Sequence, residues 1–295
     1  MDAVDLSAIH PLTPALQRVT ALDENLIADF GTLTEGWFLA SELLQPDSQR
    51  LADALTRQAA NHPHMDARTK GSYFLGEYAW YLPAAAIAAY LAEGRVPDLS
   101  LEQVALRWSR YTWHYEGESG EADRLEVRFV SGQFACLPDD AHSQHPNAQI
   151  MRDAEALREH LRSALVSHFT PLVEAVYART NLSRYALWCL VADSFAALFQ
   201  HLGEGLGDGE RARAEAMALI KAAGSPMQTS KTRYFTLEFA GHCETFRARG
   251  GCCRYYTVSE SGTDYCSTCV LRKPEDRAAR LLAYMSKKYA QEPAS

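Results

Sequence analysis

The sequence lacks a continuous apolar segment long enough to cross a membrane, which takes about 18 residues or more. The longest candidate, Trp80 to Leu91, is interrupted by Pro83 and is rich in Ala and Tyr. The N-terminus, MDAVDLSAIH, has acidic residues where a secretory signal would have Lys or Arg before an apolar run. We therefore expect a globular, cytoplasmic protein in a reducing compartment, without a membrane span or an export signal.

Basic residues are also too few for a general nucleic-acid binder. The chain has 29 Lys and Arg against 37 Asp and Glu, a formal charge of −8, whereas phosphate neutralisation requires a basic surface. A G-x-G-x-x-G fingerprint after a predicted strand is missing as well, which argues against direct use of NAD(P)H. We expect neither a nucleic-acid partner nor a bound nicotinamide.

Cysteine is too scarce for a disulfide scaffold, since seven in 295 residues leave at least one unpaired. Their distribution is uneven. Two stand alone, at Cys136 and Cys189, whereas the other five fall between positions 243 and 269: Cys243, Cys252, Cys253, Cys266 and Cys269. Such clustering needs a local explanation.

Helical periodicity dominates most of the chain. Pro83 suits the first turn of a helix that Gly94 ends, and apolar residues recur at helical spacing from Ile150 to Leu165 and from Leu187 to Phe199. Glycines at 203, 205, 207 and 209 predict a connector between helices rather than a phosphate loop. Pro274 to Tyr289 begins with acidic residues and ends with lysines, the charge order that a helix dipole favours.

Period-two alternation predicts antiparallel strands between Leu101 and Leu137, with a solvated loop from Glu116 to Ala122, and another strand from Phe235 to Phe239. The predicted fold class is α+β: mainly helical, with a small antiparallel sheet and a C-terminal cysteine-rich segment. We divide it into a helical and strand region (1–145), a helical region (146–230) and a cysteine-rich region with a capping helix (231–295).

The cysteine-rich segment has the pattern C-C-x12-C-x2-C, formed by Cys252, Cys253, Cys266 and Cys269. Cys-x-x-Cys lets two sulfurs converge on one metal ion, but adjacent cysteines fit a mononuclear tetrahedral site poorly. A binuclear iron–sulfur cluster accommodates them better, and nearby arginines would stabilise its negative charge. The pattern thus favours a [2Fe-2S] cluster, with structural zinc and a disulfide or free thiols as alternatives.

The order Lys231-Thr-Arg-Tyr-Phe-Thr-Leu-Glu-Phe, then Arg249-Gly-Gly-Cys-Cys-Arg-Tyr-Tyr, then Tyr265-Cys-Ser-Thr-Cys resembles the C-terminal signature of the FhuF-like ferric-siderophore reductases. The close resemblance covers about 45 residues. It implies that Cys252, Cys253, Cys266 and Cys269 ligate a [2Fe-2S] cluster, which passes one electron to a ferric siderophore in the bacterial cytoplasm.

Several further expectations follow from this resemblance. The substrate would be a ferric siderophore, most naturally a hydroxamate. The electron would come from an external donor such as a ferredoxin or a flavin or NAD(P)H reductase, with peripheral contact to the inner membrane or to a siderophore importer. No catalytic residue beyond the cluster is required.

Basic residues of the C-terminal segment are the candidate substrate-binding groups. From Lys231 to Lys273 the segment has a net charge of +3, which leaves −11 for the rest of the chain. The candidates are Lys231, Arg233, Arg247, Arg249 and Arg254.

Other residues are weaker candidates. His242 or Cys243 could replace a cluster ligand, and four tryptophans could stack on an aryl siderophore, although such aromatics more often serve packing. The tryptophans are Trp80, Trp108, Trp113 and Trp188. Two other function classes stay open: an iron–sulfur electron carrier or biosynthetic redox module that binds no siderophore, and a zinc-stabilised interaction protein.

Overall fold

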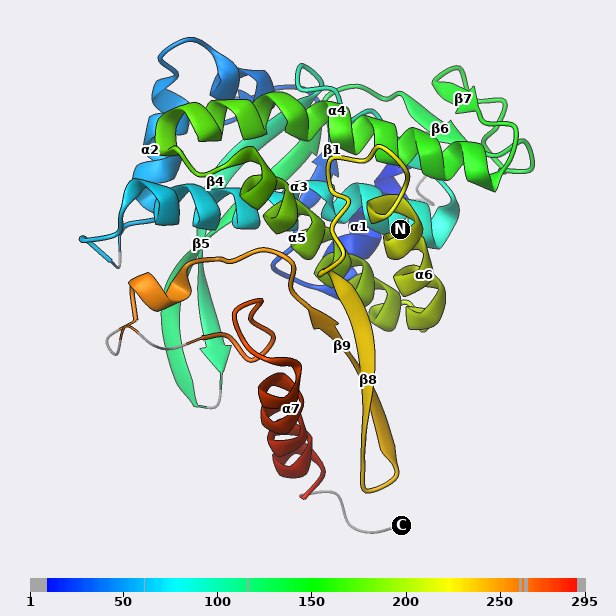
Figure 1. Ribbon diagram of the computed structural model, residues 1–295. Coiled ribbons are helices and arrows are strands. Elements are labelled where there is room, and N and C mark those ends of the chain that lie inside the picture. The colour runs from blue at the N-terminus through cyan, green and yellow to red at the C-terminus, as the bar shows by residue number, and fades with distance from the viewer. Residues whose placement is uncertain (1–9, 61, 116, 260–261, 263–264, 291–295) are drawn as a thin grey trace.

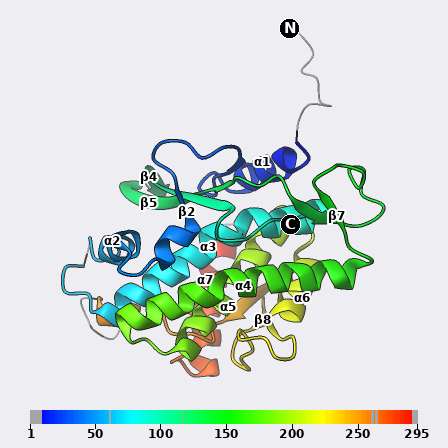
Figure 2. The same cartoon turned by 90° about the horizontal axis from the view of Figure 1, so that it is seen from above.

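The structure is a computed structural model that describes residues 10–60, 62–115, 117–259, 262 and 265–290. Its centre is a layer of long helices: α3 (Ala67–Glu93), α4 (Ala154–Thr180) and α5 (Arg184–Gly205). Figure 1 shows two β-hairpins and the C-terminal helix extending from the same side of this layer. Figure 2 shows α3 and α4 running across the layer when it is seen from above.

Four shorter helices and two 3-10 turns complete the helical part of the described residues. These are α1 (Leu12–Leu22), α2 (Gln49–Arg57), α6 (Gly209–Ile220), α7 (Pro274–Tyr289), η2 (Ala40–Leu44) and η3 (Tyr255–Thr257). The predicted helices around 150–165, 187–199 and 274–289 are confirmed, and so is the glycine-rich connector, because α5 ends at Gly205 and α6 begins at Gly209.

Helix α3 corrects the prediction that Pro83 begins a helix. The helix begins much earlier, where the side chain of Asp66 accepts from the Thr69 N–H at 2.7 Å, and Pro83 lies inside it. It ends as predicted at Gly94, whose φ of +64° is the left-handed cap that glycine adopts readily. Periodicity failed here because α3 is buried on most sides, so that it has no polar stripe to mark its face.

The main sheet has the order β1-β5-β4-β2, with β1 (Ala28–Phe30), β2 (Phe38–Leu39), β4 (Val104–Tyr115) and β5 (Glu118–Phe129). The strands predicted from alternation are confirmed. The predicted loop from Glu116 to Ala122 is wrong, because β5 already begins at Glu118 and pairs with Tyr115. Polar residues in this stretch are therefore part of a long hairpin that extends beyond the core.

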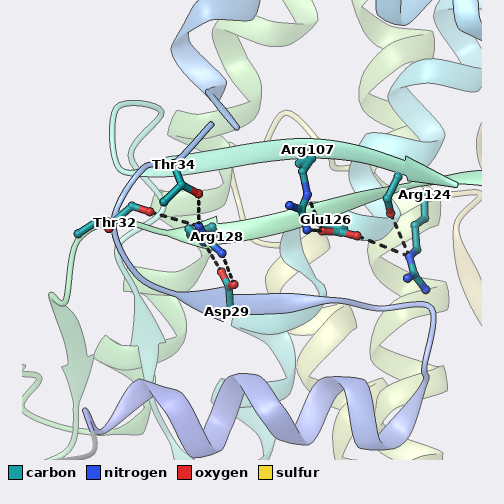
Figure 3. A network of polar contacts seen from close by, with 8 residues as sticks. Asp29, Thr32, Thr34, Arg107, Arg124, Glu126 and Arg128 are labelled. Carbon is teal, nitrogen blue, oxygen red and sulfur yellow. Dashed lines mark hydrogen bonds and ion pairs between the residues drawn. The ribbon is translucent and has the colours of Figure 1, made fainter. Parts of the chain in front are cut away.

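One face of this sheet is held by ion pairs rather than by apolar packing. Arg107 pairs with Glu126, and Arg128 pairs with Asp29 at 2.6 Å, as Figure 3 shows. The guanidinium groups of Arg107 and Arg128 also lie 4.7 and 4.2 Å from the ring of Trp37. This network joins β1, β4 and β5 on the side away from the helices.

Two smaller sheets correct the expectation of purely antiparallel pairing. The first has the order β3-β6-β7, with β3 (Val96–Pro97) antiparallel and β7 (Ala148–Ile150) parallel to β6 (Phe134–Cys136), and β1 is likewise parallel to β5. The second is the antiparallel hairpin of β8 (Arg233–Phe239) and β9 (His242–Ala248). The fold class remains α+β.

Helix α5 is long and apolar enough in composition to cross a membrane, but 72% of its most apolar window is buried inside the protein. Phe195, Leu198 and Phe199 are fully buried there. Each such side chain stabilises the fold by roughly 1.5–3 kcal/mol. The helix is a core helix, and the rest of the chain packs around it.

Candidate metal centre

The four predicted ligands lie in the segment between β9 and α7. Helix α5 fixes the position of the start of this segment. The backbone N–H groups of Gly250 and Gly251 donate to the carboxylate of Asp193 at 2.8 and 2.7 Å, and the hydroxyl of Thr232 donates to it at 2.7 Å. Asp193 is only 1% exposed. A buried carboxylate without partners costs several kcal/mol, so these three donors explain how α5 tolerates it.

The two glycines are required because the segment lies directly on the helix backbone. A Cβ at Gly251 would lie 2.9 Å from the backbone N of Leu190, and one at Gly250 would lie 2.3 Å from Thr232 Oγ1. A side chain at position 251 would therefore push the chain away from α5, and one at position 250 would push it away from Thr232. The Gly-Gly pair thus sets the position of the Cys252-Cys253 pair that follows.

The N-terminal part of α3 holds the segment from its other side. The Ser72 hydroxyl donates to the carbonyl of Cys253 at 2.8 Å. Arg254 has a left-handed φ of +61°, and its guanidinium donates to Thr69 at 2.9 Å and to Asp66 at 2.7 Å. Cys253 is therefore held in place between α5 and α3.

Two of the four cysteine sulfur atoms lie close together. Sγ of Cys253 lies 3.6 Å from Sγ of Cys266. Two thiolates bound about 2.3 Å from one tetrahedral metal ion are about 3.8 Å apart, so this separation suits a shared metal ion. The structure thus brings together one cysteine of the adjacent pair and one of the Cys-x-x-Cys turn.

A half-buried arginine faces these sulfurs. Nη1 of Arg249 lies 3.6 Å from Sγ of Cys253 and 3.6 Å from Sγ of Cys266. Its Nε is buried and has no hydrogen-bond acceptor among the described residues; the nearest carboxylate oxygen, of Asp193, is 3.9 Å away. A guanidinium group with a buried, unpaired N–H donor favours negative charge beside it. A [2Fe-2S] cluster would supply that charge, because four thiolates around two ferric ions and two sulfides carry about −2.

The charges of this group are strongly coupled. A hydrogen bond from Cys266 and the guanidinium of Arg249 lower the pKa of Cys253. That hydrogen bond and burial raise the pKa of Cys266, so the pair holds one thiolate that shares a proton with its neighbour. Burial raises the pKa of Cys252, and the charges of Cys253 and Cys269 raise it further. The pKa values of Cys252, Cys253 and Cys266 therefore each depend on a neighbouring cysteine of this group.

The Cys-x-x-Cys turn is closed by its own backbone. The N–H of Cys269 donates to the carbonyl of Cys266 at 3.0 Å, and the N–H of Leu271 points at Sγ of Cys269 at 3.5 Å. Arg272 donates to the carbonyls of Cys266 and Tyr265 at 3.0 and 2.7 Å. Such backbone N–H groups near sulfur are typical of thiolate ligands.

Across the part of the chain that the structure describes, no three His, Cys, Asp or Glu side chains are arranged around one point as a metal site would need. A structural zinc ion needs four protein ligands at one point, whereas each iron of a [2Fe-2S] cluster needs only two because sulfides complete its shell. The Cys253 and Cys266 sulfurs beside Arg249 would supply the two protein ligands that one such iron needs.

Comparison with known proteins shows which family the chain belongs to, which the geometry of the site does not show. The family described as "ferric iron reductase FhuF-like transporter" matches residues 72–244, more than half of the chain. The chain belongs to this FhuF-like family. Its members are described as ferric iron reductases, so the chain is assigned to the oxidoreductases that act on ferric iron. No curated protein matches the sequence.

The FhuF-like match covers the scaffold of the candidate site. It extends from Ser72 through α5 to β9 and includes Asp193, but it ends at Glu244, before the four cysteines. The family assignment and the sulfur geometry are therefore independent observations. The family match and the sulfur geometry concern the same part of the fold, because the matched helices hold the cysteine segment in place.

The five basic candidates are not equivalent. Lys231 and Arg233 are exposed, but Arg247 is half-buried and donates to the backbone carbonyl of Asp193. Arg249 faces the sulfurs, and Arg254 is engaged with α3. These three are thus held within the fold, whereas Arg233 donates at the surface to the carbonyl of Lys231, at 3.5 Å. Burial lowers the pKa of Arg247. As a result, only Lys231 and Arg233 are placed to steer an approaching ligand.

The weaker candidates also differ. Cys243 is exposed on β9 and lies opposite Glu238, and His242 stacks on Tyr289 with ring centroids 3.8 Å apart. Trp188 is buried, whereas Trp113 is 37% exposed on the hairpin. Packing therefore explains Trp188, and Trp113 is available to a ligand.

Sequence reasoning missed Asp193 and Ser72, the side chains that place the cysteine segment. The signal for Asp193 was present: it is the one acidic residue within the apolar run from Leu187 to Phe199. A lone acid in a core stripe needs buried donors. Ser72 gives no comparable signal, because serine occurs in helices for many reasons.

Another side chain of α3, the carboxyl group of Glu77, leads to a prediction of pH-dependent stability. Burial raises the pKa of Glu77 to about 7, against the lowering effect of its hydrogen bond with Gln58. Because the unfolded chain loses this proton near pH 4.5, the folded state binds more protons between pH 4.5 and 7. We therefore expect stability to fall as pH rises through this window, by up to about 3 kcal/mol from this group.

Urea unfolding at pH 5 and pH 8 measures this effect. Glu77→Gln removes the titrating group, so the free energy of unfolding of the variant should change less between the two pH values. The same pH dependence in both proteins would show that Glu77 titrates normally.

Proposed function

We propose that the chain is a ferric-siderophore reductase in which Cys252, Cys253, Cys266 and Cys269 hold a [2Fe-2S] cluster. The observation that carries the proposal is the sulfur pair of Cys253 and Cys266, 3.6 Å apart beside the half-buried guanidinium of Arg249. The FhuF-like family assignment supports the reductase class. When bound, the cluster supplies single electrons.

The side chains around the cysteines have defined tasks in this proposal. Asp193 and Ser72 fix the backbone on both sides of the cysteine pair, so that the sulfurs are positioned before any metal binds. Arg249 offsets negative charge, which favours the more negative, reduced state and raises the reduction potential. Its burial makes this effect stronger than that of a surface arginine.

The substrate chemistry follows from ligand hardness. Hydroxamate and carboxylate oxygens bind ferric iron much more tightly than ferrous iron, so one electron weakens the complex enough for iron to leave. No nucleophile or general acid is needed for this step. We further propose an external electron donor, a ferredoxin or a flavin-dependent reductase.

Substrate choice is a testable prediction. A cluster of low potential reduces ferric hydroxamates more readily than hexadentate tris-catecholates. We therefore expect rapid release of ferrous iron from hydroxamate or hydroxy-carboxylate complexes, and release from a tris-catecholate that is slower by at least about a hundredfold, or about 2.7 kcal/mol in the barrier.

Anaerobic mixing of the dithionite-reduced, desalted protein with each ferric complex, with a ferrous chelator to trap the product, measures this. Recovery of the visible absorption of the oxidised cluster, followed at the same time, separates a reductase from an electron carrier, which would stay reduced with every complex. Turnover of a tris-catecholate alone would contradict the hydroxamate assignment and leave the reductase class intact.

A further inference from the structure

A cavity of about 480 Å³ lies between the end of α2, the N-terminal half of α3 and the β4–β5 hairpin. We call it the α3–hairpin cavity. Figure 1 shows the hairpin extending from the helical layer on the same side as the C-terminal segment. The cavity is lined by Arg57, Gln58, Ala60, His62, Tyr73, Glu77, Arg110, Trp113, Glu121, Ala122 and Asp123.

Tyr73 joins this cavity to the candidate metal centre. It follows Ser72, whose hydroxyl donates to the carbonyl of Cys253 at 2.8 Å. Tyr73 itself lines the cavity. The cavity and the cysteine segment therefore lie at the same turn of α3.

The charges that face the cavity cancel one another. Arg57 pairs with Asp123 at 2.6 Å, and Arg110 lies 3.3 Å from Asp123 and 3.4 Å from Glu121. Two guanidinium groups thus face two carboxylates, and Glu77 adds a third carboxyl group, whose pKa burial raises to about 7. Such a site offers N–H donors to ligand oxygens but no net positive charge, so a highly charged anion gains little there.

The aromatic content suits a chelate with an organic backbone. Trp113 is 37% exposed and lies against Gly120 across the hairpin, where a Cβ would be 2.7 Å from its ring. Together with Tyr73 it gives the cavity two aromatic walls. Pockets for organic ligands typically combine such walls with a few fixed polar groups.

We propose, on the basis of the proposed function, that the α3–hairpin cavity binds the iron-chelate end of an uncharged ferric trihydroxamate. Three hydroxamate monoanions neutralise one ferric ion, whereas three catecholate dianions leave a charge of −3. The uncharged complex fits a cavity whose charges cancel. Arg57 and Arg110 would donate to the chelate oxygens, and Trp113 would cover the organic backbone.

Two other cavities are the alternatives. One, of about 550 Å³, lies between α4, β3 and β6 and is lined by Ala164 and His168, far along the chain from the cysteine segment. The other, of about 640 Å³, lies between β9 and α7 and includes Ser267 and Tyr284. The second also reaches the cysteine segment, but its lining includes one guanidinium group, that of Arg213, whereas two guanidinium groups and Trp113 line the α3–hairpin cavity.

Binding can be measured without electron transfer, because gallium(III) replaces ferric iron in such complexes and is not reduced. The probe is the gallium(III) complex of desferriferrichrome, an uncharged trihydroxamate, titrated calorimetrically into the purified full-length protein with its cluster. Ala122→Trp fills the α3–hairpin cavity, and Ala164→Trp fills the α4 cavity as its matched control. Trp113→Ala and Tyr284→Ala form a second pair, which removes one aromatic wall from the proposed cavity and one from the β9–α7 cavity.

We expect Ala122→Trp and Trp113→Ala to weaken binding by at least about tenfold, and Ala164→Trp and Tyr284→Ala to change it by less than about twofold. The gallium(III) complex of a tris-catecholate should bind the unmodified protein at least about tenfold more weakly than the trihydroxamate. Thermal melting and the visible spectrum check that each variant is folded, and Trp113→Ala provides the test if Ala122→Trp is not.

Three results would overturn the inference: unchanged binding in Ala122→Trp and Trp113→Ala, weaker binding in either control variant, or equal binding of the trianionic complex. Iron release separates these failures from failure of the proposed function. If Ala122→Trp releases ferrous iron from the ferric trihydroxamate as fast as the unmodified protein, the cavity assignment fails and the reductase stands. If the unmodified protein binds and reduces no siderophore complex, both fail.

Discussion

Replacing Cys252, Cys253, Cys266 or Cys269 singly by Ser is expected to abolish the visible absorption of the purified protein and to lower its iron and sulfide content by at least about tenfold. Loss of a supporting contact alone costs about 10- to 100-fold in metal affinity, and loss of a ligand costs at least as much. Cys253 and Cys266 should be the most sensitive pair, because their sulfurs lie 3.6 Å apart beside Arg249.

Cys243→Ser is the matched control for these variants. Cys243 belongs to the same stretch of sequence, but it is exposed on β9 rather than held in the loop. Its replacement should leave colour, iron and sulfide unchanged. The ligand assignment is wrong if Cys243→Ser loses the cluster or if Cys252→Ser keeps it. A colourless protein with one zinc ion per chain would contradict the cluster itself.

The second large effect is expected from Asp193→Ala, although Asp193 is not a candidate ligand. Its carboxylate accepts hydrogen bonds from Thr232, Gly250 and Gly251, and all three donors would be left buried without an acceptor. Each unsatisfied donor costs about 1–3 kcal/mol. We therefore expect a loss of roughly 3–5 kcal/mol in the free energy of unfolding, which is a large part of the stability of an ordinary domain.

This variant should also release the cysteine segment from α5. Chemical unfolding measures the loss of stability, and protease cleavage within residues 250–273 reports the release of the segment. Glu174→Gln is the control, because Glu174 forms an exposed pair with Arg184 and such pairs contribute about 1 kcal/mol or less. Equal stability of Asp193→Ala and Glu174→Gln would mean that Asp193 does not anchor the loop.

Local patterns predicted the elements whose surfaces are divided between core and solvent. Alternation along β4 and β5 and the helical stripes of α4 and α5 follow from such a division, and α7 has acidic residues at its start and lysines at its end. The prediction failed for α3, which is buried almost all round, and for the distal part of the hairpin, which is solvated on both faces. Periodicity needs an asymmetric environment, and neither element has one.

For the candidate site, too, some features could be predicted from local sequence and others could not. The sequence by itself determined the local chemistry: an adjacent cysteine pair, a Cys-x-x-Cys turn and a glycine pair before them, all within a short segment whose geometry depends on neighbouring residues. It also carried the resemblance to the FhuF-like family, which the comparison with known families bears out.

Only the tertiary structure decided which partners this segment meets. Asp193 lies nearly sixty positions before the glycines that it binds, and Ser72 and Tyr73 lie farther still from Cys253. Contacts at such separations depend on how α3 and α5 pack, and packing is set by the shape and burial of whole helices rather than by spacing within one of them. For this reason the cysteines could be recognised in the sequence, whereas their anchor, their facing cation and the cavity beside them could not.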